Sequence, residues 1–463
     1  MSEDGGGTAV RYRADGGGSA VRYRADAVLP CDGSGRVFRP GRVDVVGDTV
    51  VAVGPEPDPV PDASSAGWPG SGWAEVRVRG LLLPGLVNTH CHSPMTLFRG
   101  TGENLPLDRW LGEVLWPREA HLTPEDVYWG MTLAVAELLR FGVTTTCEMY
   151  FFEDALADAV VASGSRAIVT GGFLRLPGHT PDPRWWERRL DAVVDLHARR
   201  HGEAGRLEIG FGPHAAYTVP MRVLAAVADV AVERDALFHI HVAETSGEVD
   251  SYRAEHGRSV PAALADAGVF EARTVAAHSV WLSDEDIALY RRHDVAVAHC
   301  PQSNAKLASG VAPLVTLLRE GIRVGLGTDG PASNNDLDLW EEMRLAALLA
   351  RLRDGDASAL SAREALELAT RGGGAALGRK DLGVLSPGSK ADMVAMTMDD
   401  PAFVPLHEDS HLVEHLVWSA SSRLVTDVWV GGRLVVEDGT CVTVDVAEAS
   451  RQVEARSRRL AAV

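Results

Sequence analysis

Hydrophobic and polar positions change their spacing along the chain, and this change divides it into regions. Between residues 81 and 329, short apolar runs alternate with amphipathic stretches of helical periodicity. Eight such runs occur: Leu81–Thr89, Val143–Met149, Ala167–Phe173, Leu207–Gly212, Leu237–Val242, Thr274–Ala277, Val295–Ala298 and Arg323–Gly327. Strands that alternate with helices form parallel sheets, and eight such units close into a barrel. The pattern predicts an α/β protein built on a (β/α)₈ TIM-like barrel.

Three of the amphipathic stretches begin with helix-capping signals. Residues 123–126 read Thr-Pro-Glu-Asp, which places Thr at the N-cap, Pro at the first helical position and an acid at the third. Residues 283–286 and 361–364 each begin with Ser and place an acid three positions later, as in a capping box. These signals predict helices that begin just after residues 123, 283 and 361.

The two flanks of this region are rich in short apolar runs broken by Gly, Pro and Asp, which is typical of β structure. Gly431-Gly432 separates two such runs and indicates a hairpin. We therefore predict four parts: an N-terminal segment 1–26, a small composite β-sandwich domain from 27–82 and 386–442, a barrel from 83–385, and a C-terminal helix within 443–463.

The N-terminal segment consists of a tandem repeat. GGGTAVRYRAD (5–15) is followed by GGGSAVRYRAD (16–26). Two copies are too few for a repeat architecture, so a recent duplication or a misplaced start codon explains them. We expect the Gly-rich first copy to be disordered, whereas the alternating Arg and Tyr of the second copy could begin a strand.

Composition narrows the function classes. The 463 residues include 45 basic and 64 acidic side chains, a net charge of −19, which disfavours binding to nucleic acid. No stretch approaches the roughly 18 apolar residues of a membrane span, and the acidic start does not resemble a signal peptide. The five cysteines form no CxxC pair. We therefore expect a cytoplasmic protein with reduced thiols, no membrane association and a small-molecule substrate.

The ends of the predicted barrel strands carry most of the candidate chemistry, as expected for this fold. They are followed closely by His90, His92, His214, His241, Glu244, His278 and Asp329. His90 and His92 are two residues apart, so on a strand both side chains face one way. Together with His241 and Asp329 they form a three-nitrogen, one-oxygen set that suits Zn²⁺, although Fe, Mn or Co also fit. His239 repeats the His-x-His spacing beside His241.

A metal at this set would lower the pKa of a bound water from about 15.7 toward about 7, which favours hydrolysis at neutral pH. Glu244, close to His241, is the natural proton shuttle. His278 could orient the nucleophile, and the second oxygen of Asp329 could accept the water proton. The catalytic candidates are therefore Glu244, His278 and Asp329.

A competing motif lies outside the barrel. Residues 407–411 read His-Glu-Asp-Ser-His, which matches the HExxH pattern of zinc peptidases, and His415 follows four residues later. If this stretch were helical, both His407 and His411 would lie on one face. We interpret it as the start of a surface helix, because three fixed positions arise easily in a chain with 16 histidines.

The motifs in this order resemble a known superfamily. PGLVNTHCHSPMTLFRG (84–100), HIHVAET (239–245), AAHSVWL (276–282), HCPQSNAKLASG (299–310) and GTDGPASNN (327–335) are similar to the amidohydrolases. The closest resemblance is to 5′-methylthioadenosine/S-adenosylhomocysteine deaminases, relatives of triazine hydrolases and guanine deaminases. It implies the barrel, the composite β domain, one divalent metal held as above, and an acid/base role for Glu244.

The resemblance also implies substrate contacts. Trp110 and Glu119 match ribose-side residues, His214 matches a residue that contacts the base, and Ser333 matches a further pocket residue. Relatives often carry Arg at the position of Gly171, and Arg175 could substitute for it. Without that Arg, we expect a preference for adenosine, 5′-methylthioadenosine or 5′-deoxyadenosine over S-adenosylhomocysteine.

We therefore expect a zinc-dependent hydrolytic deaminase that acts at C6 of an adenine nucleoside; the resemblance also allows a homo-oligomer. Three alternatives stay open. The same pocket could act on another amino-substituted ring, such as guanine, a pterin or a triazine. The HExxH motif could make the protein a metallopeptidase. A metal-binding barrel without catalysis would leave Glu244 without a role.

Overall fold

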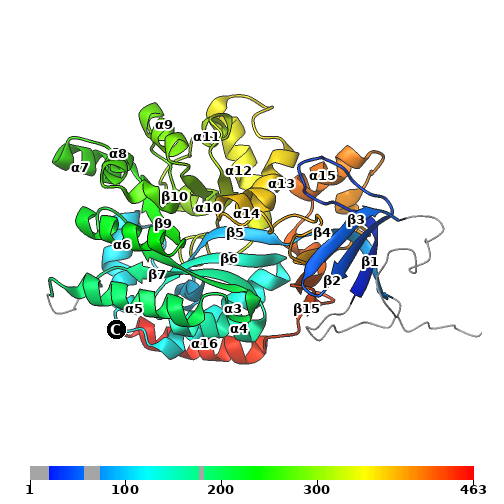
Figure 1. Cartoon of the computed structure of the whole chain (residues 1–463), viewed down its shortest axis with the longest axis horizontal. Helices are drawn as coiled ribbons and strands as arrows, with labels where there is room; N and C mark the ends of the chain where they lie inside the picture. The colour runs from blue at the N-terminus through cyan, green and yellow to red at the C-terminus, as the bar shows by residue number, and fades with distance from the viewer. Residues whose placement is uncertain (1–19, 57–72, 177–181) are drawn as a thin grey trace, which may run out of the picture.

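The computed structural model describes residues 20–56, 73–176 and 182–463, and it places them in a barrel with a smaller β domain at its side (Figure 1). Two eight-stranded sheets form these two parts. The barrel takes the middle of the chain, and both flanks contribute strands to the small domain. The predicted fold class is therefore confirmed.

The barrel strands are parallel throughout and follow one another in chain order. They are β5 (Leu86–Cys91), β6 (Val143–Tyr150), β7 (Arg166–Phe173), β8 (Leu207–Pro213), β9 (Leu237–Val242), β10 (Arg273–His278), β11 (Ala296–His299) and β12 (Val324–Leu326). The two end strands meet through a parallel bridge between Cys91 and Asp329, next to a hydrogen bond from Asp329 N to His90 O of 3.1 Å. Closure of the sheet therefore brings the first and last strand ends together.

Apolar side chains fill the barrel below its polar rim. Val87, Ile168, Leu237 and Val275 from four strands belong to one buried cluster, which also includes Leu377 just after α14 (Arg371–Ala376). The barrel is thus a packed core rather than a pore. Polar groups at the carboxyl ends of the strands are held by a rigid base.

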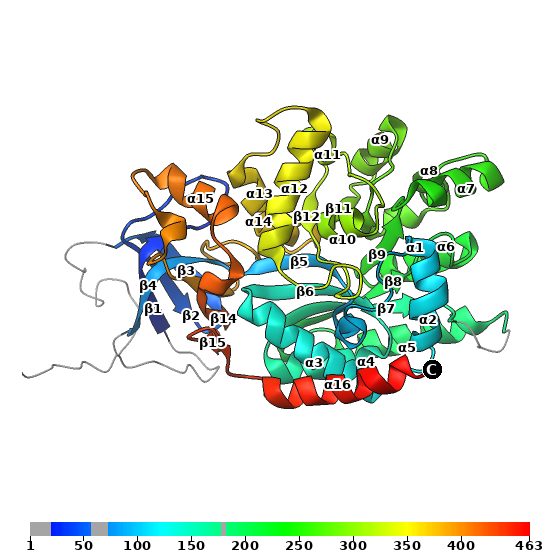
Figure 2. The ribbon, with the colours of Figure 1, turned by 180° about the vertical axis from the view of Figure 1, so that it is seen from behind.

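Helices surround the barrel (Figures 1 and 2). The main ones are α3 (Pro124–Arg140), α4 (Glu153–Ser163), α5 (Trp185–Arg200), α6 (Met221–Glu233), α7 (Ser246–His256), α8 (Val260–Asp266), α9 (Asp284–Arg292), α10 (Pro301–Lys306), α11 (Leu314–Arg319), α12 (Leu339–Asp354) and α13 (Ala362–Ala369). Capping boxes at residues 123–126, 283–286 and 361–364 start α3, α9 and α13 as predicted. The C-terminal α16 (Val446–Ala461) lies along α3, where Arg459 donates to Asp126 at 2.6 Å.

The small domain is one continuous sheet of strands from both flanks. In spatial order they are β16 (Thr440–Cys441), β15 (Arg433–Glu437), β14 (Val425–Val430), β13 (Met393–Met396), β4 (Ala74–Pro84), β1 (Ala20–Val28), β2 (Gly41–Val46) and β3 (Thr49–Pro55). The predicted hairpin at Gly431-Gly432 joins β14 to β15. β4 pairs with β13 and with β1, so it joins the two flanks where the sequence predicted a sandwich of separate sheets. Tyr23 and Trp429 from opposite halves still pack together, with ring centroids 5.2 Å apart.

Two predicted boundaries are corrected. The run Leu81–Thr89 is divided between β4 and β5, because Gly85 ends one sheet and begins the next; a Cβ there would lie 2.1 Å from Thr144 Oγ1. β1 begins at Ala20, inside the second repeat, so residues 20–26 belong to the small sheet rather than to the N-terminal segment. The first repeat, and the disorder expected for it, lie outside the described residues. Within the described ranges, the structure contains no helix that is long and apolar enough to cross a membrane.

Candidate active site

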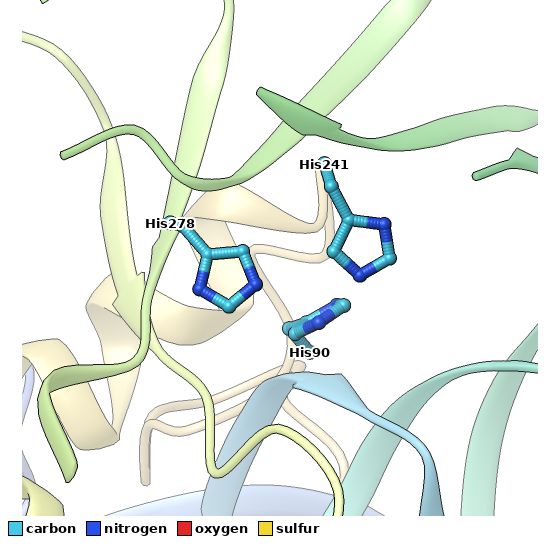
Figure 3. Close-up of side chains that lie close together, drawn as sticks. All are labelled: His90, His241 and His278. Atoms are coloured by element: carbon cyan, nitrogen blue, oxygen red, sulfur yellow. The ribbon is translucent and has the colours of Figure 1, made fainter. Parts of the chain in front are cut away.

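The barrel rim gathers the predicted metal ligands and catalytic residues around one point. His90 is the penultimate residue of β5 and His92 directly follows that strand. His241 lies on β9, His278 ends β10, and Asp329 follows β12. Figure 3 shows the rings of His90, His241 and His278 turned toward one another. Their ligand atoms lie within 4.8 Å of one another, as do those of His90, His92 and Asp329. Five side chains from the ends of four barrel strands therefore form one cluster.

The backbone turns sharply where these strands end. His278, Asp329 and Ala243, which precedes Glu244, have φ values of 68°, 58° and 52°. This left-handed region is costly for residues other than glycine, and it concentrates at functional sites. The turns direct the side chains of His278, Asp329 and Glu244 to the mouth of the barrel.

The hydrogen bonds of the ligand histidines leave a place for a cation. Nδ1 of His92 bonds to Met149 O at 2.5 Å, and Nδ1 of His241 bonds to His214 O at 2.7 Å. A carbonyl only accepts, so both Nδ1 atoms carry the proton and both Nε2 atoms present lone pairs. These two Nε2 atoms lie 3.3 Å apart, and Nε2 of His92 lies 3.2 Å from Asp329 Oδ1. Such electron-rich atoms repel one another unless a cation joins them, so the residues fit a divalent metal.

Burial keeps the ligand imidazoles in their metal-binding form. It lowers the pKa of His90 to about 3 and that of His241 well below the usual value. A neutral imidazole offers the lone pair that a metal needs. Burial alone would raise the pKa of Asp329, but the close contacts of its carboxylate with His90 and the neighbouring histidines outweigh burial and hold the pKa well below its usual range. Three imidazole nitrogens and one carboxylate oxygen form a donor set that suits zinc.

Glu244 is held beside this cluster by its own backbone. The carboxylate of Glu248 accepts from the backbone N–H of Glu244 at 2.8 Å and of Ala243 at 3.2 Å, which fixes the turn. Burial, and then the charge of Asp329, raise the pKa of Glu244 well above its usual value. Its Oε2 lies 3.7 Å from Nε2 of His278. A raised pKa favours the protonated carboxyl, which can donate its proton to a substrate.

Three polar side chains orient the catalytic candidates. Asn304 Oδ1 lies 2.9 Å from His278 Nδ1, so that nitrogen donates and Nε2 is left as an acceptor toward Glu244. Ser303 and Ser333 donate to Asp329 Oδ2 at 2.7 and 2.9 Å. Ser333, predicted as a substrate contact, therefore holds Asp329 and does not line the cavity. Its position behind the carboxylate follows from the turn after β12.

A cavity opens above the cluster and extends to a segment of short helices. This segment comprises α1 (Leu107–Arg109), a π-helical turn (Trp110–Leu115) and α2 (Trp116–Glu119). The cavity is lined by apolar side chains and by the predicted Trp110, Glu119 and His214. The indole N–H of Trp110 donates to Thr101 O at 3.1 Å. Trp110 therefore presents only its apolar ring to the cavity. Single π-helical turns occur often at functional sites.

Two polar side chains that line the cavity, Glu119 and His214, have hydrogen-bond partners in the protein. Tyr150 donates to Glu119 Oε1 at 2.7 Å. Burial raises the pKa of Glu119 to about 7, and the hydrogen bond from Tyr150 opposes this rise. His214 Nδ1 pairs with Thr218 Oγ1 at 2.9 Å, and burial lowers the pKa of His214 to about 3. Glu119 and neutral His214 are therefore placed to make hydrogen bonds to a ligand.

Arg175, which was predicted to replace the arginine that relatives carry at the position of Gly171, does not line the cavity. Arg175 is exposed and lies outside the lining. Gly171 is packed against α5, where a Cβ would lie 2.5 Å from Val193, so a side chain there would point toward that helix. Of the described residues that line the cavity, none is Lys or Arg.

The HExxH pattern does not form a site. The helix α15 begins at Asp409 and runs to Trp418, so His407 and Glu408 precede it and do not share a helical face with His411. His415 Nε2 bonds to Pro405 O at 2.7 Å. Within the part of the chain that the structure describes, both groups able to hold a metal lie at the barrel rim. The metallopeptidase alternative loses its geometric basis.

Sequence reasoning missed several residues of the site. Tyr150 ends β6, and Ser303 and Asn304 follow β11, so reading every strand end would have found them. Tyr217 follows β8 and could have been found in the same way, whereas Trp116 lines the cavity from the short-helix segment, where no signal in the sequence marks it.

Comparisons with known proteins agree with this geometry. The model of the amidohydrolase family matches residues 81–435. A 5-methylthioadenosine/S-adenosylhomocysteine deaminase of Pelotomaculum thermopropionicum is 41% identical over 434 residues, 94% of this chain and 97% of the relative. A zinc-bound adenosine deaminase of Xanthomonas campestris superposes with a TM-score of 0.87 at 35% identity, covering 96% of this chain and 99% of that one. Zinc-bound atrazine chlorohydrolase of Arthrobacter aurescens superposes with a TM-score of 0.84 at 27% identity, covering 94% of this chain and 100% of that one. The chain therefore belongs to the amidohydrolase family.

Proposed function

We propose that this protein is a zinc-dependent hydrolytic deaminase that converts the C6 amine of an adenine nucleoside into a hypoxanthine nucleoside and ammonia. The convergence of Glu244, His278 and the three-nitrogen, one-oxygen set on one cavity carries this proposal. Relatives named as deaminases of methylthioadenosine and adenosine, at 41% and 35% identity, support the substrate class.

His90, His92, His241 and Asp329 would hold the zinc ion. When bound, zinc supplies a Lewis acid that lowers the pKa of water toward about 7. Their strand-end positions, fixed by carbonyl and hydroxyl hydrogen bonds, place the set at the floor of the cavity. Iron, manganese or cobalt could occupy the same donors, and metal analysis of the purified protein would identify the ion.

The protein residues move the protons of the reaction. Protonated Glu244 donates to N1 of the adenine ring, which makes C6 electrophilic. His278, whose Nε2 is an acceptor, and Asp329 take up the proton of the attacking water. The tetrahedral intermediate at C6 then collapses, and ammonia leaves once its nitrogen has gained a proton. General acid–base groups of this kind contribute roughly 10²- to 10⁴-fold to the rate.

The substrate side favours a nucleoside with a small 5′ group. Glu119 can accept hydrogen bonds from two ribose hydroxyls, Trp110 can pack against the sugar, and His214 can contact the base. Among the described lining residues there is no cation to pair with an amino-acid carboxylate. We infer a preference for adenosine, 5′-methylthioadenosine or 5′-deoxyadenosine over S-adenosylhomocysteine.

Ammonia release from zinc-loaded protein tests the proposal. The panel contains adenosine, 5′-methylthioadenosine, 5′-deoxyadenosine, S-adenosylhomocysteine, adenine, guanine, a pterin and a triazine. Turnover of nucleosides but not of free bases supports it, and a strong preference for S-adenosylhomocysteine would overturn the inference about the 5′ group. If no adenine compound is turned over, the substrate would have to be one of the other rings.

The cytoplasmic location and the homo-oligomer stay predictions, which cell fractionation and light scattering would check.

A further inference from the structure

His239 has none of the roles described so far, although it repeats the His-x-His spacing on β9. Its side chain is completely buried. Its Nε2 lies 3.0 Å from Nδ1 of His90, and its Nδ1 lies 3.4 Å from Sγ of Cys147, which is also completely buried. Side chains from β5, β9 and β6 therefore form a hydrogen-bonded row that ends at a ligand of the metal site.

This row distinguishes His90 from the other two ligand histidines. His92 and His241 direct Nδ1 at backbone carbonyls, which only accept and so fix the proton on Nδ1. The partner of His90 is an imidazole nitrogen, which can either donate or accept. The carbonyls alone do not determine the tautomer of His90.

Two proton arrangements are open to the row when both rings are neutral. If the thiol of Cys147 donates to His239, that ring carries its proton on Nε2 and donates to His90. The proton of His90 then sits on Nε2, the atom that must face the metal. If His239 instead donates from Nδ1 to the sulfur, its Nε2 accepts from His90, and Nε2 of His90 is free.

We propose that His239 is a positioning residue that keeps the Nε2 lone pair of His90 available to zinc, with the sulfur of Cys147 as the terminal acceptor. Partners of ligand histidines commonly change metal affinity about 10- to 100-fold when they are removed. The proposal concerns zinc affinity, so it stands or fails independently of which nucleoside the enzyme deaminates.

Two isosteric substitutions separate the two nitrogens of His239. In His239→Gln the side-chain amide oxygen can occupy the place of Nε2 and accept from His90. In His239→Asn the amide reaches only the place of Nδ1, beside Cys147. We expect the Gln variant to bind zinc within a few-fold of the wild type and the Asn variant to bind about 10- to 100-fold more weakly. Affinity is measured on the full chain by competition with a zinc chelator.

Circular dichroism and thermal unfolding of the zinc-free proteins control for folding. Equal zinc affinities of correctly folded Gln and Asn variants would overturn the proposal, whether both are strong or both are weak. If either variant fails to fold, Cys147→Ser and Cys147→Val replace the pair. Ser keeps an acceptor and should retain affinity, whereas Val has none and should weaken zinc binding several-fold; thermal unfolding controls for the extra methyl group of Val. Equal affinities of these two variants would also overturn the proposal.

Discussion

The two sides of the cavity are built differently. On the metal side, His92, His241, His278 and Asp329 come from or directly follow barrel strands, and each has a hydrogen-bond partner that fixes its orientation. On the opposite side, residues 107–119 form two short helices and a π-turn that present largely apolar side chains to the cavity. Under the proposed function, the strand ends would carry the chemistry and residues 107–119 would set the selectivity, since such a connecting segment can vary without disturbing the barrel.

The largest effect should come from the metal side. In Glu244→Gln the amide cannot release and regain a proton, so we expect deamination to fall about 10²- to 10⁴-fold while zinc content is unchanged. Ammonia release from adenosine and metal analysis of the same sample measure both quantities. Glu255→Gln, an exposed acid on the neighbouring α7, is the matched control and should retain activity. Near-normal turnover by zinc-replete Glu244→Gln would refute the role of Glu244.

A smaller effect should follow on the substrate side. In Glu119→Gln the charged acceptor for the ribose hydroxyls is lost, so we expect kcat/KM for adenosine to fall roughly tenfold. Activity on 2′,3′-dideoxyadenosine should not change, because that substrate lacks both hydroxyls. Steady-state kinetics on the two substrates provide the comparison. An equal loss on both would mean that Glu119 supports the fold rather than the sugar contact.

The pH dependence of KM should also distinguish adenosine from dideoxyadenosine, with a smaller effect. Burial raises the pKa of Glu119 to about 7, so its carboxylate gains a proton as the pH falls from about 8 to about 6. A protonated carboxyl accepts fewer hydrogen bonds, so KM for adenosine should rise a few-fold over this range. Dideoxyadenosine experiences the same titrations at the metal side and serves as the control. Parallel profiles for both substrates would exclude Glu119 as the group responsible.

The sequence predicts the metal side better than the substrate side, for a physical reason. A strand places residues two apart on one face, and a barrel places its strand ends at one rim, so His90, His92, His241 and Asp329 follow from periodicity alone. A residue on an inserted segment has no such periodicity. Trp110 and Glu119 were identified only through the resemblance, and Trp116 was missed.

Contacts between individual side chains and the exact strand boundaries could not be predicted from the sequence either. Ser333 donates to Asp329 and lies outside the cavity lining, and Tyr150 donates to Glu119; these contacts depend on the exact course of the chain after each strand. The apolar run Leu81–Thr89 has no polar residue where it passes from one sheet to the other. Only Pro84-Gly85 interrupts it, and the sequence does not show that Gly85 packs closely against Thr144 at the change of sheet.

The smallest expected effect lies away from both sides of the cavity. His411→Ala removes one histidine of the HExxH pattern, whose members do not share a helix, so we expect unchanged deaminase activity and unchanged zinc content. His92→Ala is the matched comparison, since it removes a ligand at the rim and should lower zinc affinity strongly. Metal analysis after dialysis distinguishes the two variants. If His411→Ala lost zinc while His92→Ala retained it, the metal centre would belong to the small domain. The comparison of a metal side and a substrate side within the barrel cavity would then be wrong.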